Sequence, residues 1–404
     1  MNKNQEYEQL VLAVTEEIKK KNQSATIFGV GRGGWYIMKV LEYYNVPINR
    51  FIDNDIKKHG SYISYNVSSP ITSDNSILGA GVFLGVLNRK HTPNIITQLE
   101  SLGYQAIHDL MDAFLFIYFT KVVNRNVDKE AYAQAISLLY NEDKENYTAS
   151  PTLSYMITEK CSLNCQDCGA FVPETENPET FSIDSIVDDI KKYCKAFDIV
   201  HHIALQGGEP FLHPQLEELC EKVAEIPNLI FIDFVTNGTA VPAERKLKKI
   251  AKNGCTVLIS DYGTASTKIG KLTAVLNKHQ INYDYYRYDE NTLWGKQTPI
   301  FPRKRSEQKN TAFFQECISN KFLCVQIKRG EVHRCSFSNN ASQLKLIPEF
   351  EGDFVKLNSE MPEKELSKKI QEMATRDYAL NACDYCPSGE RKMVAAGIQV
   401  PRKK

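Results

Sequence analysis

The sequence predicts an α/β protein dominated by parallel sheets, and three observations support this. Apolar runs of strand length alternate with helical patterns between residues 151 and 300, as expected for a parallel sheet with crossover helices. A shorter alternation occupies residues 1–120, and all 11 cysteines lie at or after position 161. We therefore expect a partial (β/α)6 barrel over 151–300. A small Rossmann-like parallel-sheet domain would precede it, and a small cysteine-rich α+β domain over 301–404 would follow.

Composition limits the classes of function. Lys plus Arg equals Asp plus Glu at 49 each, so the zero net charge argues against nonspecific nucleic-acid binding. Residues 1–21 are charged throughout, which predicts no signal peptide. The longest weakly polar stretch, 76–87, is too short to cross a bilayer. Closely spaced cysteines in an intracellular protein are more often metal or redox sites than disulfides. We expect a cytoplasmic protein with no membrane partner.

The first region carries a dinucleotide-type pattern. A strand at 25–30 runs into Gly29-Val-Gly-Arg-Gly-Gly34, followed by a helix and a second strand at 49–55. This order marks Gly29, Gly31, Gly34 and Asp53 as candidates for binding a nucleotide, because such glycines let phosphates approach a helix N-terminus. The unit resembles small Rossmann-like domains attached to sugar-modifying enzymes. A nucleotide or nucleotide-sugar site, a turn kept without a ligand, and a nicotinamide site all remain open.

Residues 121–150 are expected to form a connector. Apolar residues between Asp128 and Tyr140 have helical spacing, and the polar run at 141–147 breaks the pattern. The favoured interpretation is a solvated linker helix.

In the barrel region, each polar turn follows a predicted strand. Strands are expected at 153–158, 199–205, 229–236, 256–260 and 281–288, with helices between them. In parallel sheets the chemistry gathers at the carboxyl ends of the strands. Three polar turns follow these ends, beginning at Gly207, Asn237 and Ser260.

The fourth turn, after the first strand, contains Cys161, Cys165 and Cys168 at C-x3-C-x2-C spacing. Three thiolates can hold three corners of a [4Fe–4S] cluster and leave one iron open to a ligand. About forty residues later comes Gly207-Gly208-Glu209-Pro210. Together these motifs resemble the radical S-adenosylmethionine (SAM) superfamily.

The resemblance implies a [4Fe–4S] cluster on the three cysteines, with SAM on its open iron. It also implies that the Gly207-Gly208-Glu209-Pro210 turn supports the SAM amino group, and that Asn237 and Ser260 hydrogen-bond its ribose or carboxylate. For the latter two, an ordinary turn residue and a strand-end cap are the alternatives. Asp167 departs from the family, which usually has an aromatic residue before the last cysteine.

The last region, 301–404, has a second cysteine set. Cys317 and Cys335 flank a hairpin-like stretch, and Cys383 and Cys386 form a C-x2-C pair. Four thiolates make a closed site, and the pattern resembles the auxiliary-cluster ("twitch") domain of radical SAM enzymes, which implies one further [4Fe–4S] cluster. Cys317 is preferred to Cys324 because its distance to Gly330 matches the family pattern. A structural zinc site is the alternative.

Four cysteines remain outside these sets. Cys194 and Cys220 fall in predicted helices and are expected in the core. Cys255, at the start of a barrel strand, and Cys324, in the hairpin, are candidate hydrogen-atom donors. For these two residues as well, burial in the core is the favoured interpretation.

The resemblance implies reductive cleavage of SAM to a 5′-deoxyadenosyl radical, which removes hydrogen from a substrate C–H bond. The Rossmann-like region and the basic, aromatic segment 294–305 favour a carbohydrate, in particular a nucleotide-linked sugar, that is oxidised or epimerised. A flavodoxin- or ferredoxin-like protein would supply the electron. The alternatives are a peptide-modifying radical SAM enzyme and a noncatalytic iron–sulfur or zinc interaction protein.

Overall fold

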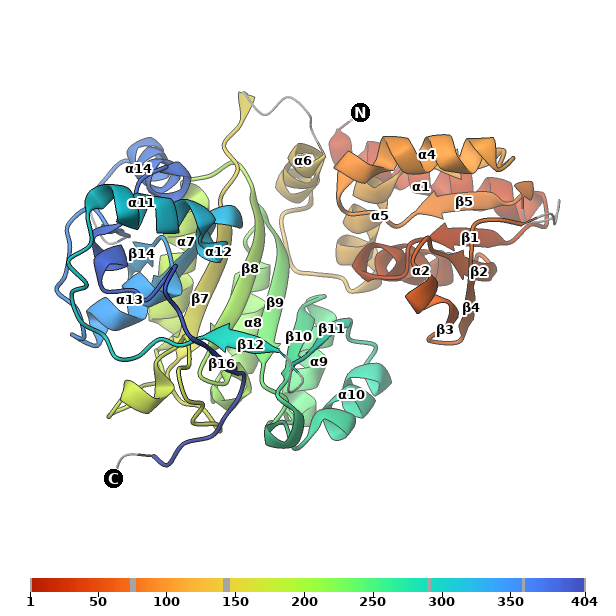
Figure 1. Ribbon diagram of the computed structural model, residues 1–404. Helices are drawn as coiled ribbons and strands as arrows, with labels where there is room; N and C mark the ends of the chain where they lie inside the picture. Colours follow the sequence, from red (N-terminus) through yellow and green to blue (C-terminus); the bar gives the residue numbers. More distant parts are fainter. Residues whose placement is uncertain (1, 73–77, 141–145, 289–291, 358–359, 403–404) are drawn as a thin grey trace. The chain divides into compact units, whose positions relative to one another are not determined.

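The computed structural model describes residues 2–72, 78–140, 146–288, 292–357 and 360–402. The chain divides into two compact units, Met1–Glu142 and Asp143–Lys404, and each is described by itself (Figure 1).

The first unit is built on a six-stranded sheet in the order β3-β4-β2-β1-β5-β6. The strands are β1 (Ala25–Phe28), β2 (Ile48–Ile52), β3 (Gly60–Tyr62), β4 (Tyr65–Ser68), β5 (Gly81–Leu84) and β6 (Ala106–His108). All neighbouring pairs are parallel except β3 with β4. The strands expected at 25–30 and 49–55 are present as β1 and β2, and the other four strands complete the sheet.

The helices of this unit are α1 (Lys3–Lys20), α2 (Arg32–Tyr43), α4 (Thr92–Ser101), α5 (Met111–Ile117) and α6 (Lys129–Leu139). The expected solvated linker is corrected here. Helix α6 packs against α1 and α5, and its Tyr132 and Ile136 are fully buried. Because these apolar side chains cover the unit's own core, α6 belongs to the first unit. The expected polar break includes 141–145, which lie outside the described residues.

The second unit is built on an eight-stranded sheet in the order β11-β10-β9-β8-β7-β13-β14-β15. The strands are β7 (Thr152–Thr158), β8 (Val200–Gly207), β9 (Leu229–Thr236), β10 (Thr256–Asp261), β11 (Tyr283–Arg287), β13 (Cys324–Lys328), β14 (Glu331–His333) and β15 (Phe354–Lys356). The five strands expected from the sequence are parallel. The sixth parallel strand is β13, beside β7. One sheet therefore crosses the boundary that we drew at residue 300.

Helices α7 (Ile183–Lys195), α8 (Leu216–Ala224), α9 (Glu244–Lys252) and α10 (Ile269–Lys278) alternate with these strands, with α7 and α8 behind them in Figure 1. Their apolar stripes bury the main core of the unit. Helix α7 shows the local cause: Ser182 caps it by accepting from the Ser185 N–H, and Ile186, Val187 and Ile190 lie on one buried face. The opposite face of the strands lines the barrel lumen.

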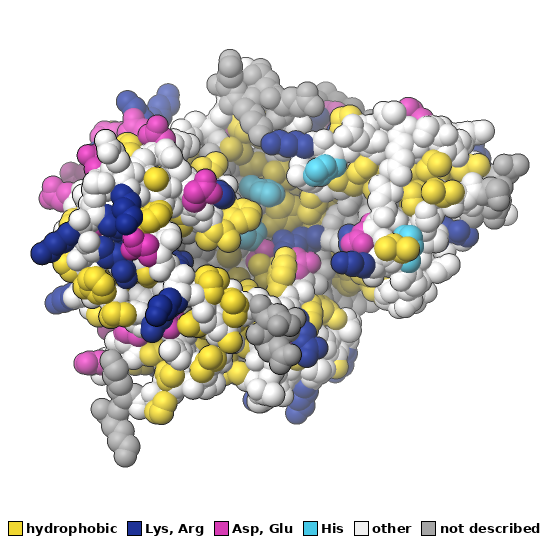
Figure 2. Space-filling view, in the orientation of Figure 1, with side chains coloured by type: hydrophobic (Ala, Val, Ile, Leu, Met, Phe, Trp, Pro, Cys, Tyr) yellow, Lys and Arg dark blue, Asp and Glu magenta, His cyan; other side chains and the backbone are white. Residues whose placement is uncertain are grey.

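The C-terminal part adds α11 (Glu307–Glu316), α12 (Ile318–Lys321), α13 (Ser336–Gln343), α14 (Glu363–Thr375) and the 3₁₀ turn η8 (Asn381–Asp384). A separate two-stranded antiparallel sheet pairs β12 (Leu293–Gly295) with β16 (Met393–Ala395). A small core forms around Phe171 and Phe337. Figure 2 shows acidic and basic side chains interspersed over this part of the surface. Among the described helices, none combines the length and apolarity that crossing a bilayer requires.

Candidate functional site

The three cysteines of the first set line one cavity of about 300 Å³. The same cavity is lined by residues that follow the next three strands, Gly207, Gly208, Asn237 and Ser260. All of these positions lie at the carboxyl ends of β7 to β10, where a parallel sheet gathers its loops. The structure thus brings together most of the SAM-site residues expected from the sequence.

The two glycines permit the close approach of β8 to the cysteine loop. A Cβ on Gly207 would collide with the carbonyl oxygen of Thr158. A Cβ on Gly208 would lie 2.5 Å from the carbonyl oxygen of Lys160 and 2.7 Å from the Cβ of Cys161. These neighbours are backbone atoms or the base of a cluster ligand and cannot move freely, so both positions require glycine.

Among the described residues, Glu209 is not part of the cavity lining, although the resemblance implies that its turn supports the SAM amino group. Its side chain is fully buried and accepts hydrogen bonds from the Thr236 hydroxyl and from the Asn237 and Phe211 N–H groups. Burial raises its pKa to about 7, against the opposing effect of these hydrogen bonds. Glu209 therefore ties the ends of β8 and β9 together, and the exposed polar groups of the turn are backbone atoms.

In the cysteine loop, Cys165 is buried, Cys161 and Cys168 are partly exposed, and the sulfur atoms of Cys161 and Cys165 receive hydrogen bonds. The Leu163 N–H lies 3.4 Å and the Asn237 side-chain amide 3.5 Å from Cys161 Sγ. Burial raises the pKa of Cys161 to about 12 and that of Cys165 to about 11. Thiols in this setting are protonated until a metal binds, and the three sulfur donors around one cavity fit a [4Fe–4S] cluster with one open iron.

Asp167 explains the departure from the family pattern. It has a positive φ of 54° and accepts hydrogen bonds from the N–H groups of Gln297 and Thr298 and from the Thr298 hydroxyl. A carboxylate thus fixes the loop to the segment after β12. The packing is polar where the family usually packs an aromatic ring.

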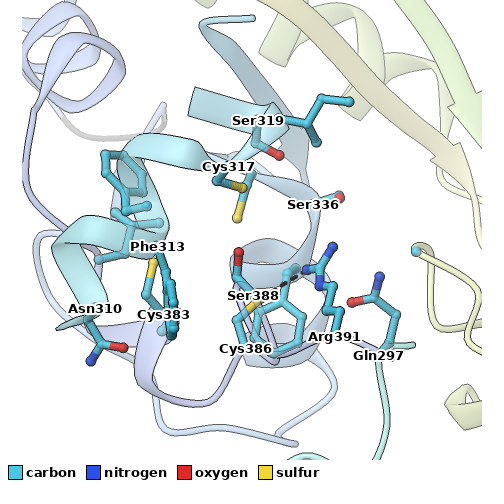
Figure 3. A pocket seen from close by; sticks show the side chains of 17 residues that line it. Gln297, Asn310, Phe313, Cys317, Ser319, Ser336, Cys383, Cys386, Ser388 and Arg391 are labelled. Atoms are coloured by element: carbon cyan, nitrogen blue, oxygen red, sulfur yellow. Dashed lines mark hydrogen bonds between the residues drawn. The ribbon is translucent and has the colours of Figure 1, made fainter. Parts of the chain in front are cut away.

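The second cysteine set also meets at one cavity, of about 160 Å³. Cys317, Cys335, Cys383 and Cys386 all line it, and Figure 3 shows Cys317, Cys383 and Cys386 around it. Cys324 is not among its lining residues in the described part of the chain. Within the described residues, no group of three His, Cys, Asp or Glu is arranged to hold a single metal ion.

Two arginines hold this second site. Arg391 donates to Cys386 Sγ at 3.0 Å, and Arg305 donates to the carbonyl oxygens of Cys383, Cys386 and Ser388. The side chain of Arg305 is only 4% exposed. The basic segment 294–305 therefore uses Arg305 to anchor the cysteine turn.

The two cavities adjoin. Gly169 and Ser336 line both of them. Each follows directly after a cysteine, Cys168 in the first set and Cys335 in the second.

Neither candidate hydrogen-atom donor reaches the SAM cavity. Cys255 precedes β10 and packs against Cys220 of α8 in the main core. Cys324 begins β13 and pairs in register with Thr152, at the amino end of β7. Both lie at the end of the sheet opposite the cavity, and this corrects their assignment as donors.

In the first unit, Gly29 and Gly31 lie in the turn between β1 and α2, and Gly34 lies in the first turn of α2. A Cβ on Gly34 would collide with the Gly29 carbonyl oxygen. Asp53 accepts hydrogen bonds from the Val30 N–H at 2.8 Å and the Asp55 N–H at 2.9 Å. Its carboxylate therefore stabilises the glycine turn itself.

Sequence reasoning did not assign several residues around the main cavity. Tyr262, Trp294 and Gln326 line it. Trp294 belongs to the aromatic segment 294–305 that was considered for the substrate, whereas no local motif marks Gln326. Tyr262 follows directly after β10, which is the one positional signal that could have identified it.

Residues 155–279 match the family model described as the radical SAM superfamily. GTP 3′,8-cyclase of Stenotrophomonas maltophilia is 32% identical over 110 residues, which cover 27% of this chain and 32% of that protein. 7-carboxy-7-deazaguanine synthase of Halobacterium salinarum is 29% identical over 103 residues, covering 25% and 38%. The chain thus spans about a third of the length of these curated relatives.

Among solved structures, BtrN in complex with AdoMet and 2-DOIA is similar at 12% identity, with a TM-score of 0.39 over 62% of this chain and 97% of that one. The family match runs from β7 to α10 and so includes the cysteine loop and most of the cavity lining.

Proposed function

We propose, from the premise that this chain belongs to the radical SAM superfamily, that it abstracts hydrogen from a carbohydrate, most specifically a nucleotide-linked sugar. The observation that carries the catalytic part is the single cavity shared by Cys161, Cys165, Cys168 and the Gly207-Gly208 turn. When bound there, the [4Fe–4S] cluster supplies the electron that cleaves SAM to methionine and a 5′-deoxyadenosyl radical.

The residues of the chain would then bind SAM and the substrate and exclude water from the cavity. Backbone groups at Gly207 and Gly208 offer hydrogen bonds to the SAM amino acid part, and Asn237 and Ser260 offer polar side chains beside it. Tyr262 and Trp294 supply aromatic walls. Such positioning matters because a radical must meet only its intended C–H bond.

A row of polar side chains in the barrel lumen supports a polar substrate. Ser154, Ala204, Asp233 and Thr256 lie in register across β7 to β10. Two positions further along the strands, Met156, Gln206 and Val235 line the cavity, so the row lies on the same face one step deeper. The small side chain of Ala204 leaves space in this row. The polar side chains of Ser154, Asp233 and Thr256 suit a substrate rich in hydroxyl groups.

His202 lies on the same face two positions before Ala204, opposite Phe231 in the register. Its Nε2 atom lies 2.6 Å from Oδ2 of Asp233, which is 1% exposed. The pair joins β8 to β9 toward the amino end of the sheet, away from the cavity.

The second cavity supports oxidation as the outcome. Four thiols around it fit one auxiliary [4Fe–4S] cluster, with a zinc site as the alternative. A redox-active auxiliary site adjoining the first cavity is suited to accept an electron from a substrate radical. Epimerisation would need a hydrogen-atom donor, and Cys255 and Cys324 lie at the wrong end of the sheet. A flavodoxin- or ferredoxin-like donor would reduce the first cluster.

The first unit is proposed to bind a nucleotide at Gly29, Gly31 and Gly34. The glycine turn at the start of α2 supports this. Asp53 would act by holding the turn, since its carboxylate is already engaged there.

The test is release of 5′-deoxyadenosine by the anaerobically reconstituted, reduced protein in deuterated water, with and without a panel of nucleotide-sugars. GTP belongs in the panel because the name of a curated relative refers to it. Stimulation by one nucleotide-sugar with loss of two hydrogens from it supports oxidation, and gain of one deuterium indicates epimerisation. Stimulation by GTP alone, or by no member of the panel, overturns the sugar assignment, and peptides become the next candidates.

A further inference from the structure

A C-terminal segment lies directly on the cysteine loop of the first cavity. After β16, Gly397 turns the chain at a positive φ of 75°. A Cβ there would lie 2.7 Å from the Cβ of Tyr262, so the turn passes tightly against a cavity-lining residue. Residues 398–402 then run over the cysteine loop, and we call residues 397–402 the strap.

Backbone hydrogen bonds dock the strap in register. The Gln166 N–H donates to the Ile398 carbonyl at 2.7 Å, and the Val400 N–H donates to the Asn164 carbonyl at 2.9 Å. Between them, Cys165 and Gln399 form an antiparallel bridge. The strap is therefore paired with the cysteine loop as a short strand would be.

The side chain of Gln399 makes the contact with the sulfur. Its Oε1 accepts a hydrogen bond from the Asn164 N–H at 2.8 Å. This fixes the orientation of the amide, because a backbone N–H can only donate. The amide nitrogen of Gln399 then points to Cys165 Sγ at a distance of 3.0 Å.

Arg402 adds a second attachment at the start of the loop. Its guanidinium donates to the Cys161 carbonyl at 2.5 Å and to the Leu163 carbonyl at 3.4 Å. The strap thus contacts the loop at two of its three cysteines. It leaves Cys165 only 7% exposed.

We propose that Gln399 is a positioning residue of the radical SAM cluster: its amide N–H···S bond to Cys165 raises the reduction potential of the cluster. A hydrogen bond to a ligating sulfur stabilises the more negative, reduced state of the cluster, so the reduction potential rises with such a bond. This inference rests on the proposed function only in that Cys165 is a cluster ligand.

The test compares the reconstituted full chain with Gln399→Leu and Gln399→Glu. Leucine has a similar size and donates no hydrogen bond. Glutamate keeps the acceptor for the Asn164 N–H and replaces the donor by a negative charge. Gln215→Leu is the matched control, because Gln215 is exposed and its side chain donates a hydrogen bond to Glu218 at the start of α8. Potentiometric titration followed by electron paramagnetic resonance reports the potential of the cluster whose signal changes when SAM is added.

The expected result is a lower potential in Gln399→Leu, a still lower one in Gln399→Glu, and no change in Gln215→Leu. Loss of only the SAM-responsive signal from a folded Gln399 variant, with the auxiliary iron retained, also supports the proposal. Equal potentials and equal iron content in all four proteins overturn it and leave the strap as simple packing. If the unsubstituted protein shows no SAM-responsive cluster, the radical SAM site itself has failed, which is a different result.

Discussion

Glu209 offers a prediction whose size follows from the structure. Its carboxyl is fully buried and its pKa is raised from 4.5 to about 7. The native state therefore keeps its proton to a higher pH than the unfolded chain does. The penalty for the charged form is absent well below pH 4.5, grows as the pH rises, and reaches about 3 kcal/mol above pH 7.

The perturbation is Glu209→Gln, which keeps the shape and removes the ionisation. Between pH 5 and pH 7.5 the wild type should lose about 2 kcal/mol of unfolding free energy relative to the variant. The assay is urea unfolding of the reduced apoprotein at both pH values, where the loop thiols remain protonated because burial raises the pKa of Cys161 to about 12. Any constant cost of the amide cancels in this double difference.

Glu372→Gln controls for the loss of one negative charge, because Glu372 lies on α14 with 63% of its side chain exposed. A difference between wild type and Glu209→Gln that stays constant across this pH range would refute the reasoning. It would mean that the hydrogen bonds from Thr236, Asn237 and Phe211 outweigh burial.

Three further predictions concern the other sites. The Gly208→Ala variant should fold and yet lose most SAM cleavage, because the added Cβ collides with the cysteine loop. Anaerobic release of 5′-deoxyadenosine measures the cleavage, and a rate equal to that of the wild type would contradict the prediction. Cys317→Ser should lose the iron of the auxiliary cluster, which is about half of the total for two four-iron clusters, while Cys324→Ser should keep it. Iron analysis together with Mössbauer spectra measures the loss. Equal iron in both variants would exclude Cys317 as the auxiliary ligand. Asp53→Ala should destabilise the first unit by about 2 kcal/mol, because the Val30 N–H loses a charged acceptor; thermal unfolding measures this, and an unchanged melting temperature would count against it.

The sequence predicted the strands and their polar turns well because apolar runs and parallel order leave few alternatives. The runs at 229–236 and 256–260 became β9 and β10 nearly unchanged. The position of β13 could not be predicted, because it pairs with β7, whose residues lie about 170 positions earlier. Pairing over such a separation depends on the tertiary fold and has no local signal.

The same limit applies within the site. The spacing of the cysteines predicted two sets of cluster ligands, and each set lines one cavity. The role of Glu209 depends on partners at the end of β9, and that of Gln399 depends on a bridge to Cys165. Neither residue has a neighbour in sequence that reveals its contact. The burial of α6 was missed because a helix with one apolar face has the same sequence pattern beside a core and in a linker.

The position of β13 also determines how the second unit can be divided. Residues 155–279 look like a separable module, yet their first strand has β13 as its neighbour on one side, and Lys328 at the end of β13 forms a buried ion pair with Glu159 at 2.8 Å. A fragment ending near residue 300 would leave β7 as a bare apolar edge and Glu159 without its cation. Such edges recruit other chains and aggregate. Exchange of the C-terminal part between related proteins, by engineering or in evolution, therefore requires the exchange of a complete strand of the catalytic sheet.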